Sequence, residues 1–335
     1  MKAVILYGPR DVRLGDFPTA PVLPGTVKVA VAWCGICGSD LHKFDGKKNT
    51  HPIKYPVPLG HEISGYVAEV GESVEGYAVG DPVTVDPNWS CGKCAFCQKG
   101  MPSFCEKGRG VVKGMAEFVV APVENVYHLP VGMDMKAAAL TEPLSCCLHG
   151  LDLLDIKAGQ TVALVGFGAI GAMMLQLIRR AGAGQVIVLE TNEAKREAAL
   201  AMGANRFLSP ADEAAVAELA ETVNIDRVVE CVGIVPAQAT ALRVAGRGAT
   251  VVLFGVADEA DRLPVSVYEA FIKELTIKTS FVNPHTTQRA IDLLASGVLD
   301  VDSLISSTLQ MDEVAGELET RANVRAGKVL VEIKA

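Results

Sequence analysis

The chain has 335 residues, of which 50% are hydrophobic and 21% charged, and its net charge is −8 at neutral pH. That length is enough for two domains with sizeable cores. The acidic balance and the lack of a Lys/Arg cluster argue against nucleic-acid and anionic-membrane partners, and no apolar run approaches the ~20 residues that span a bilayer. The apolar start of the chain is too short for a signal peptide, so we expect a cytoplasmic protein.

The first 130 residues or so contain short β-branched runs separated by Gly and Pro. Examples are the segments 27–31, 65–70, 83–85 and 117–120. This pattern is typical of a β-rich domain, an antiparallel barrel or sandwich, whose long loops carry functional groups. Two of these loops hold almost all the Cys and His residues of this part of the chain, which indicates metal binding.

The first of these loop regions offers one thiol, one imidazole and one carboxylate. Cys37 lies in the run 34–42, and His61 and Glu62 stand side by side further along the chain. This donor set suits a zinc ion that keeps one position open, which is the catalytic arrangement. Cys34 forms a C-x-x-C pair with Cys37, but no βαβ pattern of a redox motif surrounds it, so we interpret Cys34 as a buried thiol.

The second loop holds four cysteines at C-x2-C-x2-C-x7-C spacing: Cys91, Cys94, Cys97 and Cys105. Four thiolates this close can complete a tetrahedron around zinc, and closed sites of this kind are structural. An iron–sulfur cluster is the alternative. The odd total of nine cysteines and their bunched spacing argue against a disulfide framework. We therefore expect two zinc ions per chain.

From about residue 141 onward, strands alternate with Ala-rich helices. This alternation predicts a doubly wound parallel sheet, an α/β fold, with strands at 161–165, 186–190, 227–230 and 249–254. A helix at 287–296 and a strand at 328–333 follow, and this tail is expected to return to the first domain. The predicted boundaries are 1–142 for the β-rich domain with a metal lobe at about 88–110, 143–281 for the α/β domain, and 282–335 for the returning tail.

The loop that follows the first strand of the α/β domain has the spacing G-x-G-x-x-G. Gly166 allows a tight turn, Gly168 lets the backbone approach a pyrophosphate, and Gly171 lets helix and strand pack closely. Glu190 ends the next strand, where a carboxylate would bind ribose hydroxyls and repel a 2′-phosphate, so NAD is favoured over NADP. The candidate cofactor-binding residues are Gly166, Gly168, Ile170, Gly171, Glu190 and Arg196, of which the last also suits a solvated helix face.

Together these motifs resemble the zinc-containing medium-chain alcohol dehydrogenases over essentially the whole chain. The resemblance rests on the run around Cys37, on Gly60-His61-Glu62, on the four-cysteine loop and on the Gly166–Gly171 loop, which occur in this order. It implies a GroES-like catalytic domain with both zincs and a Rossmann coenzyme domain, with the active site in the cleft between them. We also expect a homodimer or homotetramer.

Within this family, the segment 141–145 resembles the polyol dehydrogenase branch, sorbitol dehydrogenase and its bacterial relatives. The ethanol-type branch has a Cys ligand where Glu142 stands, and the polyol branch has this Glu-Pro-Leu. The implied reaction is the reversible NAD-dependent oxidation of a secondary alcohol of a polyol or sugar alcohol to a ketose. The implied partner is thus a small-molecule polyol.

The sequence departs from the family pattern in two places, and the first of them leaves the substrate open. Phe281-Val282-Asn283 replaces a Phe-Arg-Tyr segment that supports the substrate in polyol enzymes, and Gly38 replaces an Arg that binds pyrophosphate in ethanol-type enzymes. The alternative substrates are a polyol phosphate or an amino-alcohol such as L-threonine. The candidates to meet a phosphate are His285, Lys43 and Lys47.

The resemblance also assigns roles around the open metal site. Ser39 takes the hydroxyl proton and His42 passes it toward solvent, which suits a group that both donates and accepts and an imidazole that titrates near neutrality. A hydrogen-bonding role is the alternative for Ser39. Glu62 is expected to be the resting carboxylate ligand, with Glu142 nearby or exchanging with it.

Overall fold

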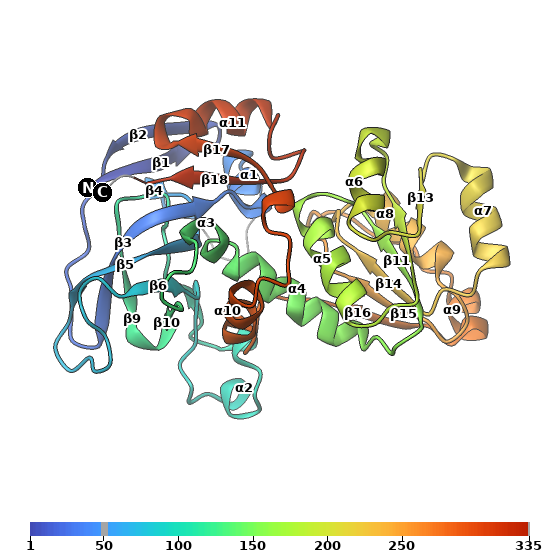
Figure 1. The fold of residues 1–335 in the computed structure, drawn as a ribbon, viewed down its shortest axis with the longest axis horizontal. Coiled ribbons are helices and arrows are strands. Elements are labelled where there is room, and N and C mark those ends of the chain that lie inside the picture. The colour runs from blue at the N-terminus through green and yellow to red at the C-terminus, as the bar shows by residue number, and fades with distance from the viewer. Residues whose placement is uncertain (48–52, 334–335) are drawn as a thin grey trace. The chain divides into compact units, whose positions relative to one another are not determined.

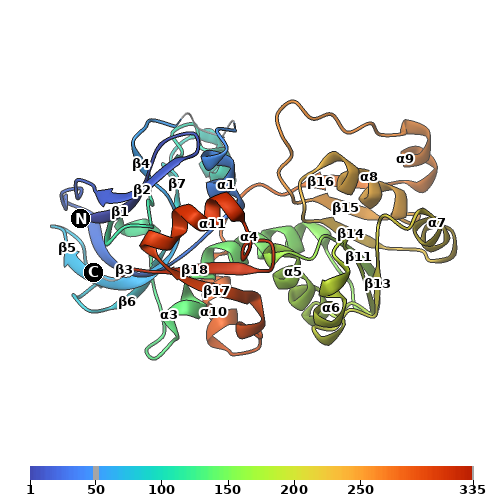
Figure 2. The same cartoon turned by 90° about the horizontal axis from the view of Figure 1, so that it is seen from above.

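The computed structural model describes residues 1–47 and 53–333. They form two compact units, shown in Figures 1 and 2: one contains residues 1–145 and 283–335, and the other contains residues 146–282. The chain therefore leaves the first unit after Ser145 and returns to it at Asn283. The helix α4 (Thr141–Leu154) carries the chain across the first of these boundaries.

A seven-stranded sheet is the centre of the first unit. Val27, Val29 and Val31 alternate along its long strand β3 (Thr26–Gly35) and are at most 2% exposed. Gly65 in β5 (Glu62–Val70) lets the two strands approach closely, because a Cβ there would lie 2.1 Å from a carbonyl oxygen of β3. The other strands are β6 (Pro82–Val85), β9 (Phe118–Pro122), β10 (Val126–His128), β17 (Ile305–Gln310) and β18 (Lys328–Glu332).

The C-terminal strand β18 completes this sheet by pairing antiparallel with β3 and parallel with β17. The sheet therefore differs from the expected antiparallel arrangement at one pair. Parallel strands need a crossover connection, and the helix α11 (Val314–Thr320) lies between β17 and β18 in the chain and provides it. The result is that a residue on β18 can lie beside residues near the start of the chain.

Smaller elements surround this sheet. A second sheet has the order β2 (Asp11–Asp16), β1 (Lys2–Gly8) and β4 (Val57–Pro58). The helices of the unit include α1 (Gly38–Phe44), α3 (Met135–Ala138) and α10 (Thr287–Ala295). The four-cysteine lobe is built from β7 (Asn88–Trp89), α2 (Ala95–Gln98) and β8 (Arg109–Gly110).

The second unit is a doubly wound α/β domain, as predicted. Its six parallel strands have the order β13-β12-β11-β14-β15-β16, and helices cover the sheet (Figure 1). Apolar residues of β11, β12, β14 and β15 form the core with α7 and α8. The strands are β11 (Thr161–Val165), β12 (Gln185–Leu189), β13 (Arg206–Leu208), β14 (Arg227–Glu230), β15 (Thr250–Leu253) and β16 (Thr276–Thr279). The helices are α5 (Ala169–Arg180), α6 (Arg196–Ala201), α7 (Glu213–Thr222), α8 (Val235–Val244) and α9 (Val267–Lys273).

Candidate active site and metal centres

The first unit brings together the three predicted ligands of the open metal site. Cys37 precedes α1, and His61 and Glu62 stand at the start of β5; one ligand atom of each lies within 4.8 Å of the others. Burial, together with the nearby Glu62 carboxylate, raises the pKa of the Cys37 thiol to about 11. A divalent cation would reverse this balance, since a coordinating thiol loses its proton. One thiolate, one imidazole and one carboxylate fit zinc with an open position.

Glu62 is also half of a buried ion pair that the sequence did not reveal. Both of its carboxylate oxygens accept hydrogen bonds from Lys328 Nζ on β18 at 2.8 Å, and the same ammonium donates to the Ile36 carbonyl at 3.2 Å. Gly35 leaves the space, because a Cβ there would lie 1.9 Å from Glu62 Oε2. A carboxylate has about four acceptor positions, so the ion pair leaves Glu62 capacity for a metal.

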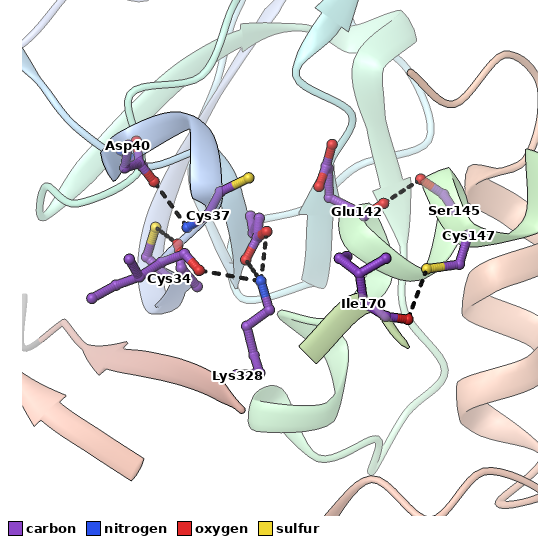
Figure 3. Close-up of polar contacts among 12 residues, drawn as sticks. Cys34, Cys37, Asp40, Glu142, Ser145, Cys147, Ile170 and Lys328 are labelled. Carbon is purple, nitrogen blue, oxygen red and sulfur yellow. Dashed lines mark hydrogen bonds and ion pairs between the residues drawn. The ribbon is translucent and has the colours of Figure 1, made fainter. Parts of the chain in front are cut away.

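Glu142 lies near this cluster but outside the group of three ligands. It is in the first turn of α4 and is 8% exposed. Figure 3 shows its side chain beside that of Cys37, across a gap. Burial raises the pKa of Glu142 to about 8; the charge of His61 lowers it, and that of Glu62 raises it. Glu62 is therefore one of the three converging ligands, and Glu142 lies close to them.

Asp40 is a further buried group of this site that sequence reasoning missed. It accepts hydrogen bonds from the backbone N–H groups of Cys37 and Gly60, each at 3.1 Å, and is fully buried. Burial alone would raise its pKa, but Lys43, His61 and the two backbone donors hold the pKa of Asp40 below its ordinary value. The sequence could have pointed to Asp40 through its position in the first turn of α1, because an acidic side chain there can cap the helix.

The predicted relay residues lie on the same short helix. Ser39 and His42 are half-buried and three positions apart in α1, a spacing that puts two side chains on neighbouring parts of one helix face. Lys43, a candidate phosphate contact, lies 3.6 Å from Asp40 in an ion pair. The other two such candidates, Lys47 and His285, are exposed.

The four cysteines of the lobe converge on one point. One sulfur of each lies within 4.8 Å of the others, and Cys94 Sγ is 3.5 Å from Cys97 Sγ and 3.9 Å from Cys105 Sγ. Zinc–sulfur bonds of 2.3 Å in a tetrahedron place sulfurs about 3.8 Å apart, so the spacing fits zinc. Backbone N–H donors from Cys97 and Glu106 lower the pKa of Cys94 to about 6, which favours its thiolate form. None of the nine cysteines, all of which lie within the described residues, is part of a disulfide bond.

In the second unit, the Gly-rich loop has the geometry of a phosphate-binding turn. Gly166 has a φ of +91°, and a Cβ at this position would lie 2.4 Å from Val232 Cγ2. A Cβ at Gly171 would lie 2.1 Å from the Gly166 carbonyl oxygen, so both glycines are required by packing. Gly168 precedes α5, and no heavy atom lies within 4 Å of the place a Cβ would occupy there. Ile170 is half-buried in the first turn of α5. The helix N-terminus is thus open to an anion.

Glu190 is held rigidly beside this loop. Its carboxylate accepts hydrogen bonds from the N–H groups of Phe167 at 2.8 Å and Asn192 at 2.9 Å. Burial alone would raise the pKa of Glu190, but these donors and Lys195 hold this pKa below its ordinary value. Lys195 Nζ lies 4.0 Å from this carboxylate and donates to the Phe167 carbonyl, so Lys195 is a cofactor candidate that sequence reasoning missed. Arg196 instead pairs with Glu193 and donates to a carbonyl of β13 at 3.0 Å.

Comparisons with known proteins identify the family. The family model of the alcohol dehydrogenase GroES-like domain matches residues 23–131, and that of the zinc-binding dehydrogenase matches residues 169–296. D-arabinitol dehydrogenase 1 of Uromyces fabae is 30% identical over 99% of this chain and 97% of its own length. Sorbitol dehydrogenase of Bacillus subtilis is 29% identical over 95% of this chain and 93% of its own length.

A solved structure, a zinc-binding dehydrogenase of Sinorhizobium meliloti bound to NADP, superimposes with a TM-score of 0.93 at 36% identity and covers 99% of both chains. The chain belongs to the zinc-containing medium-chain alcohol dehydrogenases, oxidoreductases, and has relatives of the polyol type. The predicted GroES-like and Rossmann folds are confirmed. Within residues 1–47 and 53–333, no helix combines the length and the apolar character needed to cross a membrane.

Proposed function

We propose that the protein oxidises a secondary alcohol of a polyol or sugar alcohol to a ketose, reversibly, with NAD as hydride acceptor. The observation that supports this most is the donor set of the open site: Cys37, His61 and Glu62 together, with Glu142 beside them. These three residues would hold a catalytic zinc, and the four lobe cysteines would hold a structural one. Zinc at an open site supplies a Lewis acid for the alcohol oxygen, and NAD accepts the hydride.

The protein's own groups orient the substrate and move its proton. Ser39 is the proposed acceptor of the hydroxyl proton, and His42 on the same helix passes it toward solvent. Glu142 is the proposed hydrogen-bonding partner of the other substrate hydroxyls, because its carboxyl lies buried beside the proposed metal ligands and its oxygens can accept from hydroxyl groups. Asp40 keeps Cys37 and Gly60 in place through their backbone N–H groups.

The test is an assay of a substrate panel at saturating NAD with zinc present. The panel contains short and hexose-derived polyols, their phosphate esters, L-threonine and simple primary alcohols. A polar site rejects substrates that leave its buried groups unpaired, by roughly 10⁴-fold in kcat/KM, so we expect polyols to exceed ethanol by a wide margin. The highest kcat/KM on ethanol or a long aliphatic alcohol would contradict the proposal.

A polyol phosphate or L-threonine is the second candidate substrate. The observation in favour of a different substrate is Asn283, which stands where polyol enzymes have a Tyr that supports the substrate. Asn283 is only 2% exposed and donates to Asp86, so it is unsuited to the role of that Tyr. Against a phosphate, Lys43 is already paired with Asp40. A strong preference for phosphate esters in the panel would promote this candidate.

Preference for NAD over NADP is the first prediction from the second unit. The Glu190 carboxylate is held ionised beside the Gly-rich loop, and a 2′-phosphate of about two negative charges placed near it would be repelled. We expect kcat/KM to be at least about tenfold higher with NAD than with NADP. A factor of ten corresponds to a repulsion of about 1.4 kcal/mol. Glu190→Ala should narrow the difference.

Lys195→Ala is the matched control, because it removes the cation 4.0 Å from the same carboxylate and should widen the difference. Steady-state kinetics with both cofactors decide the matter. Equal or better turnover of the unmodified protein with NADP would contradict the NAD assignment.

A homo-oligomer is also proposed, with the outer edge of the six-stranded sheet as its interface. β16 is the edge strand of the sheet. A charged side chain on an edge strand opposes pairing with another chain, but Lys278, the one charged residue of β16, donates to the Leu153 carbonyl instead. The adjacent helix α9 exposes large apolar residues, of which Tyr268 is 73% and Phe271 81% accessible. A second copy can pair with such an edge symmetrically and cover this helix.

Phe271→Asp should therefore lower the oligomeric state. A charge in the interface core would be desolvated, so sedimentation at micromolar concentration should show a smaller species than the unmodified protein does. Val131→Asp, at an even more exposed apolar position on the first unit, is the control and should leave the oligomer intact. A monomeric unmodified protein, or an unchanged Phe271→Asp oligomer, would contradict this interface.

A further inference from the structure

A polar network lies in the first unit, at the base of the four-cysteine lobe. Asp86 directly follows β6, and its Oδ2 accepts hydrogen bonds from Asn283 Nδ2 at 3.1 Å and Thr287 Oγ1 at 2.8 Å. Its Oδ1 accepts from the N–H of Asn88 at 2.9 Å, and Asn88 Nδ2 donates to Asn283 Oδ1 at 2.7 Å. Asn283 and Thr287 are 2% and 3% exposed, whereas Asp86 is half-buried and Asn88 is exposed, so the network runs from the surface of the lobe into the interior of the unit.

The network continues from Asn283 to the helix that carries Glu142. Thr286 Oγ1 lies 3.1 Å from the Asn283 carbonyl oxygen and 2.8 Å from the Ser145 carbonyl oxygen. Ser145 Oγ donates to the Glu142 carbonyl at 2.6 Å, and Thr286 and Ser145 are buried. Figure 3 shows this last bond beside the Glu142 carboxyl. A series of hydrogen bonds, continued through the covalent frames of Asn283 and Ser145, therefore joins Asp86 to the first turn of α4.

The same network reaches the lobe through Asn88. This residue begins β7, which pairs with β8 across the lobe, and Cys91 follows three positions later. Asn125 Nδ2 fixes the local backbone by donating to the carbonyls of Asp86 at 2.8 Å and Asn88 at 3.2 Å. The lobe and the start of α4 thus share one anchor, although their residues are far apart in sequence.

We propose that Asp86 and Asn283 are positioning residues for Glu142, and that the lobe supports the active-site carboxyl through them. This inference rests on the proposed function in one respect: the proposed function is what assigns Glu142 a contact with the polyol. Neither residue touches substrate in this proposal. They act by fixing the backbone of α4 at its first turn, since buried polar groups that lose a partner drive rearrangement.

The test exchanges the two side chains. Asp86→Asn alone places two amide donors face to face, and a turn of the Asn283 amide relieves this only if the Asn88 amide turns with it, so the native arrangement of hydrogen bonds is lost. Asn283→Asp alone places two carboxylates face to face. The double exchange restores every bond: the new amide at 86 donates to the new carboxylate at 283 and to Thr287, and that carboxylate accepts from Asn88.

Two measurements are made on the zinc-loaded protein. The first is hydrogen–deuterium exchange of the amides of residues 141–145, which should rise in each single variant and return to normal in the double exchange. The second is steady-state kinetics: misplacing a contact group should raise KM for the polyol by roughly 10- to 100-fold while KM for the dinucleotide is unchanged, again with rescue in the double exchange. Loss of general stability would instead move both KM values.

Two further variants complete the design. Thr286→Val removes only the hydroxyl that reaches Ser145, so it should raise exchange at 141–145 even if Asp86→Asn does not fold. Glu317→Gln is the control, since Glu317 is a buried carboxyl that accepts from the N–H groups of Asn323 and Val324, which lie close to it in the chain. It should lower stability, with altered exchange confined to residues near 317–324 and an unchanged polyol KM.

The outcomes separate the two proposals. Normal exchange at 141–145 in Asp86→Asn and Thr286→Val, or failure of the double exchange to restore it, would overturn the positioning role. Exchange that rises and is rescued while the polyol KM stays constant would support the positioning role and contradict the contact of Glu142 with substrate.

Discussion

Replacing Lys328 by Met is expected to destabilise the first unit by about 3–5 kcal/mol, because it leaves the Glu62 carboxylate buried without its partner. Glu62 is fully buried and Lys328 is 3% exposed, so water cannot take over the lost interaction. Activity should also fall, by roughly 10- to 100-fold, since residues that orient a metal ligand have effects of that size. Both tryptophans, Trp33 and Trp89, belong to the first unit, so urea unfolding followed by tryptophan fluorescence reports on this unit directly.

The pH range for this experiment follows from the ion pair. Burial acts to lower the pKa of Lys328, but the Glu62 carboxylate raises it above its ordinary value. A group whose folded pKa is raised stabilises the fold fully below the unfolded value of about 10.4 and loses that effect only as the pH rises through the folded value. The contribution of Lys328 to the stability of the unmodified protein should therefore be constant from pH 6 to about 9.

The double variant Glu62→Gln/Lys328→Met is the matched control. It removes both charges, and buried ion pairs replaced by neutral groups often cost little stability, so unfolding should return toward the normal midpoint. Activity should stay low, because a proposed metal ligand is lost. If Lys328→Met alone were as stable as the unmodified protein, the ion pair would have no net structural role.

The elements of the second unit could be predicted from sequence because their signals are local. The strands β11 and β14 match the predicted segments 161–165 and 227–230 residue for residue, since each has buried apolar residues at its centre. The Gly-rich loop was readable for the same reason. The three-residue strand β13 was not predicted, because so short an edge strand leaves no periodic pattern.

The contacts that organise the active site were beyond the sequence because they join distant parts of the chain. Lys328 and Glu62 are 266 residues apart, and only the pairing of β18 with β3 brings them together. Asn283 shows the same limit: as a sequence letter it marked a departure from a substrate-binding segment, whereas the fold buries it against Asp86. Donor type and spacing identified the metal ligands, but not the residues that hold those ligands in place.

Two cysteine substitutions should separate the roles of the two metal centres. Cys94→Ser is expected to abolish metal binding in the lobe, because a closed four-thiolate site loses one of four ligands and its binding free energy is folding free energy. A loss of several kcal/mol corresponds to a melting temperature lower by about 10 °C for a unit of this size. Trp89 lies at the base of the lobe, with Arg109 over its ring at 4.3 Å, so its fluorescence should report the change.

Cys37→Ser should have the opposite profile. The open site would lose its thiolate, and activity should fall by on the order of 10³-fold, which is several kcal/mol of transition-state stabilisation. The melting temperature should change little and the lobe should keep its zinc, so metal analysis should find about one zinc per chain in place of two. Cys94→Ser should therefore mainly lower stability, whereas Cys37→Ser should mainly lower turnover.

Cys34→Ala is the control for both variants, since this thiol is fully buried three positions before Cys37 but is not among the converging ligand atoms. It should keep both zincs and most of its activity, and lose about 1–2 kcal/mol of stability through the small cavity it creates. One zinc or none in the active, untreated protein would contradict the two-site assignment. A Cys94→Ser variant that retained two zincs and a normal melting temperature would contradict the structural role of the lobe, because the stabilising metal would then have to be held by other groups.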